Sequence, residues 1–216
     1  MAKRSDTKGK LFVISGPSGA GKGTICNALM ADADPDELCL SISVTTRGPR
    51  KGEEDGVNYY FITEEEFSEL QANGGLLEFA EVYGHHYGTP KEKVIEKLNA
   101  GVDVILEIEM QGALKVKQSY PDGVFIFILP PSMAELRKRI TGRGTESKED
   151  INYRLSQALS EIAYINKYDY AVVNGKLEEA VERVKAIIKA EHSRVAEDIY
   201  KLIEEYKECE INEEDE

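Results

Sequence analysis

The sequence has few cysteines, no long apolar run and fewer basic than acidic residues. Three cysteines among 216 residues, an odd number without metal-like spacing, exclude a disulfide framework and favour a reduced compartment. No apolar stretch approaches the about 20 residues that cross a bilayer. The basic start MAKRSDTKGK has no apolar segment behind it, which excludes a signal peptide. We therefore expect a cytoplasmic protein with no membrane partner.

The shortage of basic residues excludes a further class of partner. The chain has 27 lysines and arginines against 40 aspartates and glutamates, for a formal charge of −13. A protein that wraps nucleic acid usually presents a basic face, so this balance argues against a general nucleic-acid binder. Residues 204–216 contain eight carboxylates and one lysine, and we expect this acidic tail to be solvated.

Short apolar runs alternate with helical patterns along most of the chain. Five runs have the length and β-branched content of strands that are buried on both faces: Leu11–Ser15, Leu38–Val44, Val102–Ile108, Val124–Leu129 and Tyr170–Val173. Helical spacing is found at about residues 22–32, 91–100, 110–119, 132–141, 149–166 and 177–206. This alternation predicts an α/β fold with a parallel five-stranded sheet flanked by helices.

Two segments interrupt the alternation. Residues 45–90 combine a loop rich in glycine, proline and charge with strand-like runs and an acidic amphipathic stretch, which indicates a small, mostly β insertion. Residues 142–150 begin as a polar, glycine-flanked stretch between two helices, and we expect them to form a short lid. The predicted core therefore comprises residues 1–44 and 91–216, with the insertion between them.

The segment after the first predicted strand has the pattern of a phosphate-binding loop. The apolar run LFVIS is followed by seven residues that lead into a helical pattern: Gly16, Pro17, Ser18, Gly19, Ala20, Gly21 and Lys22. Glycines let consecutive backbone N–H groups point at phosphate oxygens, and a helix N-terminus adds a favourable partial charge. Lys22 is the candidate cation for the β- and γ-phosphates. The pattern asks for Ser or Thr after the lysine; this chain has Gly23 there, and Thr24 follows as the candidate magnesium-binding hydroxyl.

Arginines recur in the polar segments. Arg47 and Arg50 lie on an irregular loop, where two guanidinium groups suit a phosphate that is not transferred, although the same spacing also occurs on solvated surfaces. Arg139 and Arg143 lie at the edge of the predicted lid, and Arg154 lies in the helix after it. Phosphoryl transfer needs cations that close over the developing charge, and these last three are candidates for that role.

Several separated motifs together resemble the guanylate kinase family. They are, in chain order, GPSGAGKGT, SVTTRGPRKGE, GVNYYF, LLEFAEVYGHHYGTP, ILEIEMQG, IFILPPS, and the stretch from GRGTES to INYRL. The resemblance runs from about Leu11 to Ala190. It implies a P-loop kinase core that carries a GMP-binding insertion and a lid, in agreement with the interrupted alternation.

The resemblance also implies roles for single residues. Four side chains would hold the phosphate of GMP: Arg47, Arg50, Tyr59 and Tyr87. Four would surround the guanine: Ser43, Glu78, Thr89 and Glu109. The role of Glu78 makes chemical sense, because one ionised carboxylate accepts from the adjacent N1–H and N2–H of guanine, a pair that adenine does not offer. The family commonly has Asp where this chain has Glu109, and the extra methylene shifts the carboxylate.

The implied reaction is transfer of the γ-phosphoryl group of ATP to GMP, and to dGMP, with Mg²⁺. Lys22 and the lid arginines would be the catalytic cations, while Thr24 and Glu107 are candidates for magnesium. Two rivals stay open: a non-catalytic guanylate-kinase-like module that binds proteins, which the intact loop opposes, and a kinase for another nucleoside monophosphate, which Glu78 opposes. The apolar spacing of the last helix is interrupted near His192. It resumes from Val195 to Tyr206, past the end of the resemblance, and predicts a satellite helix or a homodimer contact there.

Overall fold

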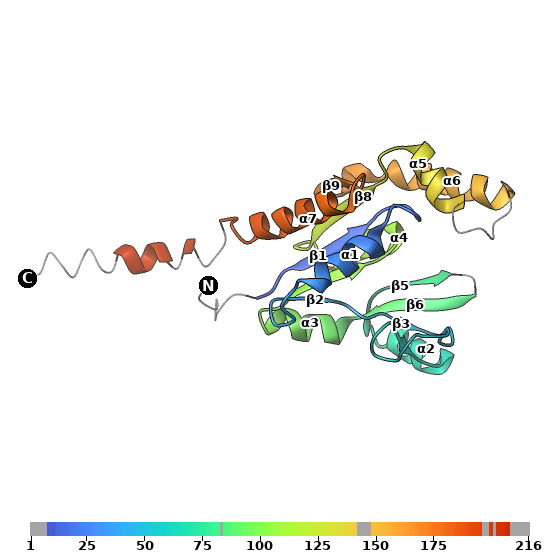
Figure 1. Ribbon diagram of the computed structural model, residues 1–216. Coiled ribbons are helices and arrows are strands. Elements are labelled where there is room, and N and C mark those ends of the chain that lie inside the picture. Colours follow the sequence, from blue (N-terminus) through green and yellow to red (C-terminus); the bar gives the residue numbers. More distant parts are fainter. Residues whose placement is uncertain (1–7, 83, 142–147, 196–198, 201, 208–216) are drawn as a thin grey trace, which may run out of the picture.

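A parallel sheet of five strands forms the centre of the protein. The computed structural model describes residues 8–82, 84–141, 148–195, 199, 200 and 202–207. The strand order is β2-β7-β1-β8-β9 (Figure 1), and Val13 in the central strand pairs with Leu106 of β7 and Phe125 of β8. The strands are β1 (Leu11–Ser15), β2 (Leu38–Leu40), β7 (Asp103–Glu107), β8 (Val124–Leu129) and β9 (Tyr170–Val173). The predicted fold class is confirmed.

Helices cover both faces of this sheet, because successive residues of a strand point to opposite sides. On one face, Phe12 and Ile14 share an apolar cluster with residues of α1 (Lys22–Ala31) and α7 (Leu177–Glu191). On the other face, Leu11 and Val13 share a cluster with residues of α3 (Lys91–Asn99) and α4 (Met110–Ser119). Burial on both sides explains why the strand sequences are continuously apolar.

A second, mixed sheet lies beside the first, with the order β4-β3-β6-β5 (Figure 1). Its strands are β3 (Val44–Thr45), β4 (Tyr60–Phe61), β5 (Leu76–Val82) and β6 (His85–Pro90). Helix α2 (Glu64–Ala72) begins with a capping box, in which Thr63 and Glu66 each bond the other's backbone N–H, and it buries Phe67. These elements fall within the stretch where the sequence predicts an insertion; the division into domains stays a prediction.

The single strand predicted over Leu38–Val44 is wrong. Strand β2 ends at Leu40, one further bond joins Ser41 N to Ile105 O at 2.8 Å, and Val44 then begins β3 in the other sheet. The chain changes sheets here because Val44 and Thr45 pair with β4 and β6, not with β7.

Helices α5 (Met133–Thr141) and α6 (Lys148–Ile162) pack on each other through a separate apolar cluster that includes Leu136 and Leu155. Residues 142–147, which make up most of the predicted lid, lie outside the described residues. A 3₁₀ turn (Ile165–Lys167) follows α6 and leads into β9. This turn therefore connects α6 to β9, which is an edge strand of the main sheet.

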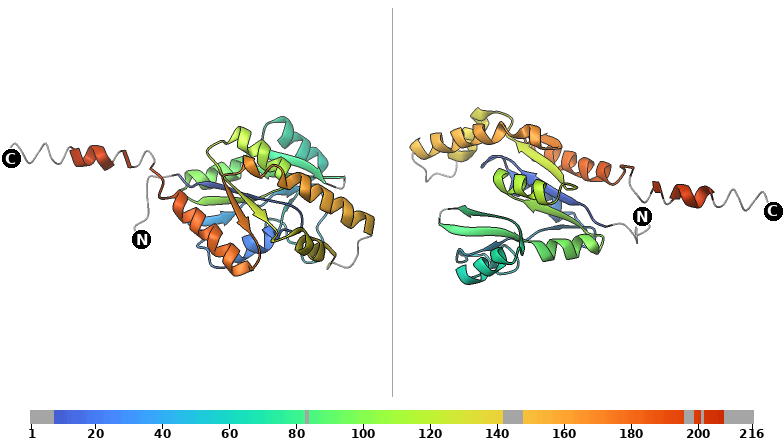
Figure 2. Two further views of the ribbon diagram at one scale, coloured as in Figure 1. Left: turned by 90° about the horizontal axis from the view of Figure 1, so that it is seen from above. Right: turned by 180° about the vertical axis from the view of Figure 1, so that it is seen from behind.

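The helical pattern predicted over residues 177–206 is interrupted in the structure near His192, as its apolar spacing indicates. Helix α7 ends at Glu191, which accepts a hydrogen bond from the hydroxyl of Tyr170, and His192 pairs with Asp103 at the start of β7. These contacts hold the end of α7 on the body. Residues 199–200 and 202–207 are helical again and extend away from both sheets (Figures 1 and 2). Within the described ranges, no helix has the length and apolar character needed to span a membrane.

Candidate active site

A cavity of about 530 Å³ opens where the strands of the main sheet reach their carboxyl ends. Strands β1, β7 and β9 end at this edge, which is where open α/β sheets bind their ligands. The cavity is lined by Ser18, Gly19, Gly21, Lys22, Gly23, Thr24, Glu107, Glu109, Arg139, Asn174, Gly175 and Leu177. Most of the predicted phosphate-binding loop therefore faces one cavity.

Three glycines give the loop between β1 and α1 its shape. Gly16, Gly19 and Gly21 have φ angles of 144°, 88° and 95°, which side-chain-bearing residues rarely adopt. A side chain at Gly16 would collide with the carbonyl of Ile128 in β8, and one at Gly21 with the amide of Asn174. The loop thus lies tightly on the sheet edge and leads directly into the N-terminus of α1, as a phosphate-binding loop requires.

Lys22 begins α1 and lies inside the curve of the loop, with 8% of its side chain exposed. Its Nζ donates to Gly16 O at 2.6 Å and lies 3.4 Å from Glu109 Oε1. Ala20 N donates to Pro17 O at 3.0 Å and closes the turn before it. The ammonium group is therefore available at the cavity wall, where phosphate oxygens would meet it.

Arg139 and Asn174 both hold the loop at the carbonyl of Ala20. Arg139 Nη1 donates to Ala20 O at 3.3 Å, and Nη2 donates to Asn174 O at 2.9 Å. Asn174, directly after β9, donates its Nδ2 to the same Ala20 carbonyl at 2.8 Å. Glu135 accepts from Arg139 Nε at 3.2 Å, one helical turn away. The guanidinium of Arg139 is thus fixed at the cavity that the sequence predicts for it.

A second predicted arginine reaches the loop from α6. Arg154 Nη2 donates to Ser18 Oγ at 2.7 Å, so helix α6 touches the predicted phosphate-binding loop directly. Arg143, the third predicted cation, lies outside the described residues. The structure therefore brings two of the three lid-side arginines to the loop.

Two candidate magnesium ligands, Thr24 and Glu107, line the same cavity. Burial raises the pKa of Glu107, Lys22 lowers it, and Glu109 raises it. A Cβ at Gly23 would lie 3.2 Å from Glu107 Oε1, so the position where the loop pattern asks for Ser or Thr lies beside this carboxylate. Hydroxyl and carboxylate oxygens suit Mg²⁺. Over the described ranges no three His, Cys, Asp or Glu side chains cluster as a metal cage.

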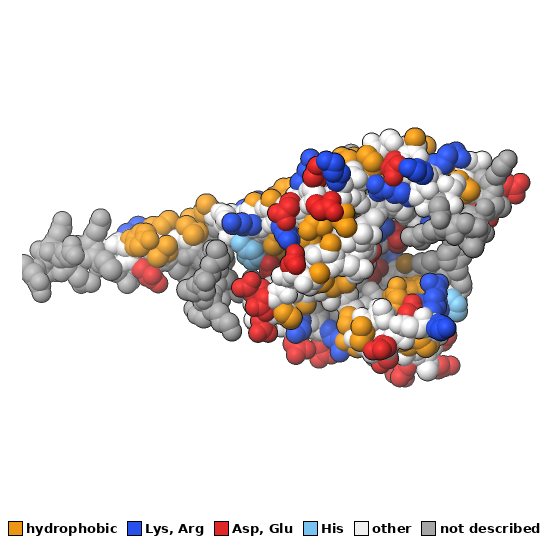
Figure 3. Space-filling model, viewed as in Figure 1, with side chains coloured by type: hydrophobic (Ala, Val, Ile, Leu, Met, Phe, Trp, Pro, Cys, Tyr) orange, Lys and Arg blue, Asp and Glu red, His pale blue; other side chains and the backbone are white. Residues whose placement is uncertain are grey.

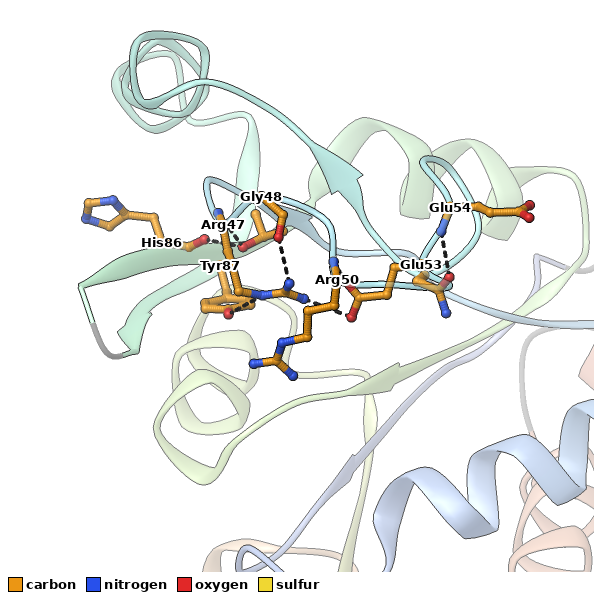
Figure 4. A network of polar contacts seen from close by, with 9 residues as sticks. Arg47, Gly48, Arg50, Glu53, Glu54, His86 and Tyr87 are labelled. Atoms are coloured by element: carbon orange, nitrogen blue, oxygen red, sulfur yellow. Dashed lines mark hydrogen bonds and ion pairs between the residues drawn. The ribbon is translucent and has the colours of Figure 1, made fainter. Parts of the chain in front are cut away.

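The predicted GMP-phosphate residues lie together at the second sheet, and Figure 4 shows three of them, Arg47, Arg50 and Tyr87. Arg47 Nε donates to Tyr87 OH at 3.2 Å, and its Nη2 lies 3.0 Å from Glu53 Oε1. Glu53 also accepts from the backbone N of Arg50 at 2.7 Å and raises the pKa of Arg47. The ring of Tyr59 lies 5.9 Å from that of Tyr87 and 5.5 Å from the Arg47 guanidinium carbon. Tyr59 and Tyr87 therefore neighbour Arg47, and Glu53 holds the Arg47 side chain and the backbone of Arg50.

Glu78 lies on β5 next to this cluster and is buried, with 7% of its surface exposed. Thr89 Oγ1 donates to Glu78 Oε1 at 2.7 Å, while Gly112 in the first turn of α4 packs against Oε2. Burial raises the pKa of Glu78; the Thr89 bond and Lys115 lower it. Tyr87 and Thr89 are two residues apart on β6, so they point to the same face. The arginine cluster and the buried carboxylate thus share one side of the sheet.

Two other predicted guanine contacts have different surroundings. Ser43 directly precedes β3, and its carbonyl accepts from Tyr60 N at 2.9 Å. Glu109 is the N-cap residue of α4, makes no side-chain cap bond, and lies beside Lys22 with 57% of its side chain exposed. Glu109 therefore borders the phosphate cavity, and its contact with guanine stays a prediction.

Three residues of the site were not found by sequence reasoning. Asn174 follows a buried strand, a position that could have suggested a role at the sheet edge. Glu53 lies in the charged loop that also carries Arg47, where carboxylates are usually solvated. Glu161 lies on α6; its Oε2 is buried and has no hydrogen-bond partner within the described part of the chain. Burial, and then the charge of Glu109, raise its pKa to about 7, and no sequence pattern indicates this.

Comparisons with known proteins agree with this geometry. The guanylate kinase family model matches residues 8–191. Guanylate kinases of Clostridium acetobutylicum and Caldanaerobacter subterraneus are each 56% identical to this chain, over 87% and 92% of it and 88% and 96% of their own lengths. A crystal structure of guanylate kinase from Anaplasma phagocytophilum, 38% identical, superposes with a TM-score of 0.70 and covers 88% of this chain and 89% of its own. The chain therefore belongs to the guanylate kinase family.

Proposed function

We propose that this chain transfers the γ-phosphoryl group of ATP to the phosphate of GMP, giving ADP and GDP. One observation carries the proposal: a glycine loop with a buried lysine and a separate arginine and tyrosine cluster beside a buried carboxylate occur in one chain. The first suits a triphosphate, and the second suits a monophosphate whose base donates two hydrogen bonds. Membership of the guanylate kinase family supports the same reaction.

On the ATP side, residues 16–24 would hold the triphosphate and Lys22 would neutralise charge between the β- and γ-phosphates. Arg139 and Arg154 already contact the loop, so small movements would bring their guanidinium groups to the transferring phosphoryl group. Arg143 is proposed as a third cation. The acceptor is already an anion, so no general base is needed, and positioning with charge stabilisation carries the catalysis.

On the GMP side, we assign the phosphate to Arg47, Arg50, Tyr59 and Tyr87, and the guanine to Ser43, Glu78, Thr89 and Glu109. Thr89 uses its hydroxyl proton on one Glu78 oxygen, which leaves acceptor capacity on the carboxylate for guanine N1–H and N2–H. The 2′-position of the sugar is not part of this recognition, so dGMP is a second expected substrate.

Magnesium is the expected cofactor. Thr24 would offer its hydroxyl and Glu107 would hold magnesium-bound water. The ion, when bound, supplies positive charge that neutralises the phosphates.

Two alternatives are less well supported. A non-catalytic guanylate-kinase-like module needs neither the glycine loop nor a buried Lys22, and both are present. A kinase for another monophosphate would not need a buried carboxylate at Glu78. The cytoplasmic location inferred from composition stays a prediction.

A panel of acceptors tests the proposal. Purified protein with magnesium-ATP is offered GMP, dGMP, AMP, UMP and dTMP, and ADP formation is followed. We expect GMP and dGMP to react far faster than the others. Equal rates with AMP would defeat the guanine assignment, and no GMP-dependent ADP formation would defeat the kinase assignment.

We also propose that the segment from Val195 to Tyr206 forms a contact between two copies of this chain. Its apolar side chains are exposed (Figure 3): Val195 by 69%, Tyr200 by 62%, Leu202 by 38%, Ile203 by 39% and Tyr206 by 61%. The segment lies beyond the part of the chain that the family model matches. Such a cluster on a projecting helical segment is typical of an association surface.

A further inference from the structure

Glu109 lies at the start of α4, whose first turn contacts both proposed substrate sites. It is the N-cap residue of α4, and its Oε1 is 3.4 Å from Lys22 Nζ in the phosphate cavity. Three residues further on, Gly112 packs against Glu78 Oε2. The beginning of α4 is therefore in contact with the triphosphate side through one residue and with the guanine side through another.

More than one group can accept a hydrogen bond from the Lys22 ammonium. In this structure it donates to Gly16 O at 2.6 Å and pairs with Glu109. A triphosphate in the loop needs the same donors, because Lys22 is the cation that the loop places at the phosphates. The carboxylate of Glu109 and the phosphates of ATP therefore compete for one cation. Glu107 and Glu161 also act on this region, since Lys22 lowers the pKa of both, but the ion pair at contact distance belongs to Glu109.

The length of the Glu109 side chain decides whether it competes with the phosphates for Lys22. The N···O distance of 3.4 Å is close to the upper limit for an ion pair. An aspartate at position 109 would be shorter by one methylene, about 1 Å of reach, and would leave its carboxylate beyond about 4 Å from the ammonium. The pair therefore depends on this chain having Glu and not Asp at this position.

We propose that Glu109 couples the binding of the two substrates, because it exchanges its ion pair with Lys22 for a contact with guanine. The proposal rests on the function proposed above. ATP bound alone must break the Lys22–Glu109 pair, and GMP bound alone must also break it to use Glu109. When both substrates bind, the free energy needed to break the Lys22–Glu109 pair is spent in one binding step only. Each substrate therefore tightens the binding of the other by the same factor. Because Glu109 is largely exposed, the factor is about two- to fivefold and falls as salt is added.

Binding measurements test the coupling without turnover. Calorimetry gives the Kd of a non-hydrolysable ATP analogue with magnesium, alone and with saturating GMP, and the Kd of GMP with and without the analogue. The variants are Glu109→Asp, which shortens the side chain, and Glu109→Gln, which keeps its length and removes its charge. Glu96→Asp on α3, an exposed position that does not line the phosphate cavity and is not assigned to GMP, is the matched control. Since Glu109 makes no side-chain cap bond, the melting temperatures should stay close to that of the wild type.

We expect both Glu109 variants to bind the analogue alone about two- to fivefold more tightly than the wild type, because no ion pair has to be broken. The coupling factor should fall to near one in both variants and persist in Glu96→Asp. An unchanged analogue Kd in Glu109→Asp, or full coupling in that variant, would overturn the proposal. The analogue-only experiment contains no GMP. A chain that fails to bind GMP therefore refutes the proposed function and the coupling together, whereas a chain that binds GMP with unaltered analogue affinity in the variants refutes the coupling alone.

Discussion

Replacing Glu78 by Gln changes one terminal group of a buried carboxylate in the proposed guanine site. Glu78 accepts from Thr89 Oγ1 at 2.7 Å and is 7% exposed. The substitution keeps the volume of the side chain and converts one acceptor oxygen into an N–H₂ donor. Whichever way the amide is oriented, one guanine N–H would then face an N–H in a site with little access for water.

The expected loss of activity in Glu78→Gln follows from the burial of this side chain. A buried donor without an acceptor costs roughly 1–3 kcal/mol, and more where the lost bond was charge-assisted. In kcat/KM for GMP this corresponds to a loss of about ten- to a hundredfold or more. AMP offers no such pair of donors, so its poor rate should change much less. Because burial already raises the pKa of Glu78, the wild-type kcat/KM for GMP should also fall as the pH drops through that raised pKa, and this acid limb should disappear in the variant.

Steady-state kinetics with GMP and AMP for the wild type and Glu78→Gln decide the matter. Glu81→Gln is the matched control, since Glu81 lies on the same strand and is exposed. The reasoning requires the ratio of GMP to AMP rates to collapse in Glu78→Gln alone. Equal loss for both substrates, or an unchanged rate with GMP, would show that the carboxylate is structural.

Three further predictions concern other parts of the chain. Lys22→Met should fold normally and lose about two orders of magnitude or more in turnover, since a preorganised cation at the transferring phosphates contributes several kcal/mol; near-normal turnover contradicts its role. A chain that ends at Arg194 keeps the contacts of Glu191 and His192, and should stay active but sediment as a monomer, unlike the full chain; identical sedimentation excludes the dimer contact. Glu161→Gln should leave stability unchanged near about pH 5 and raise the melting temperature by a few degrees near about pH 8, because a carboxyl whose pKa is raised to about 7 loses its stabilising contribution as the pH rises through that value. Thermal scans at both pH values measure this, and a pH-independent difference would contradict it.

The phosphate-binding loop and the main sheet could be predicted from the sequence because their requirements are local. Positive φ angles at Gly16 and Gly21 require glycine, and strands buried on both faces require continuous apolar runs. These constraints are visible in consecutive residues. The GMP-phosphate cluster was predicted through family resemblance, since residues as distant as Arg47 and Tyr87 meet only in the folded sheet.

The features that sequence reasoning missed depend on contacts between distant segments. Helix α7 ends where Glu191 and His192 contact Tyr170 and Asp103. The interrupted apolar spacing near His192 indicates this break, but it does not indicate the partners that hold it. The ion pair between Lys22 of α1 and Glu109 at the start of α4 depends on Glu109 being one methylene longer than an aspartate. Such contacts are decided by tertiary packing, which single-sequence patterns do not contain.

The central claim is that the two sites form one centre for phosphoryl transfer, and the fate of the γ-phosphate tests it most directly. Purified protein is incubated with GMP and magnesium-ATP that carries an isotopic label in the γ-phosphate, and the products are separated. We predict that the label is recovered in GDP, in an amount equal to the ADP formed, and that Lys22→Met forms almost none. Label released as inorganic phosphate, or ATP consumption that does not depend on GMP, would contradict the account.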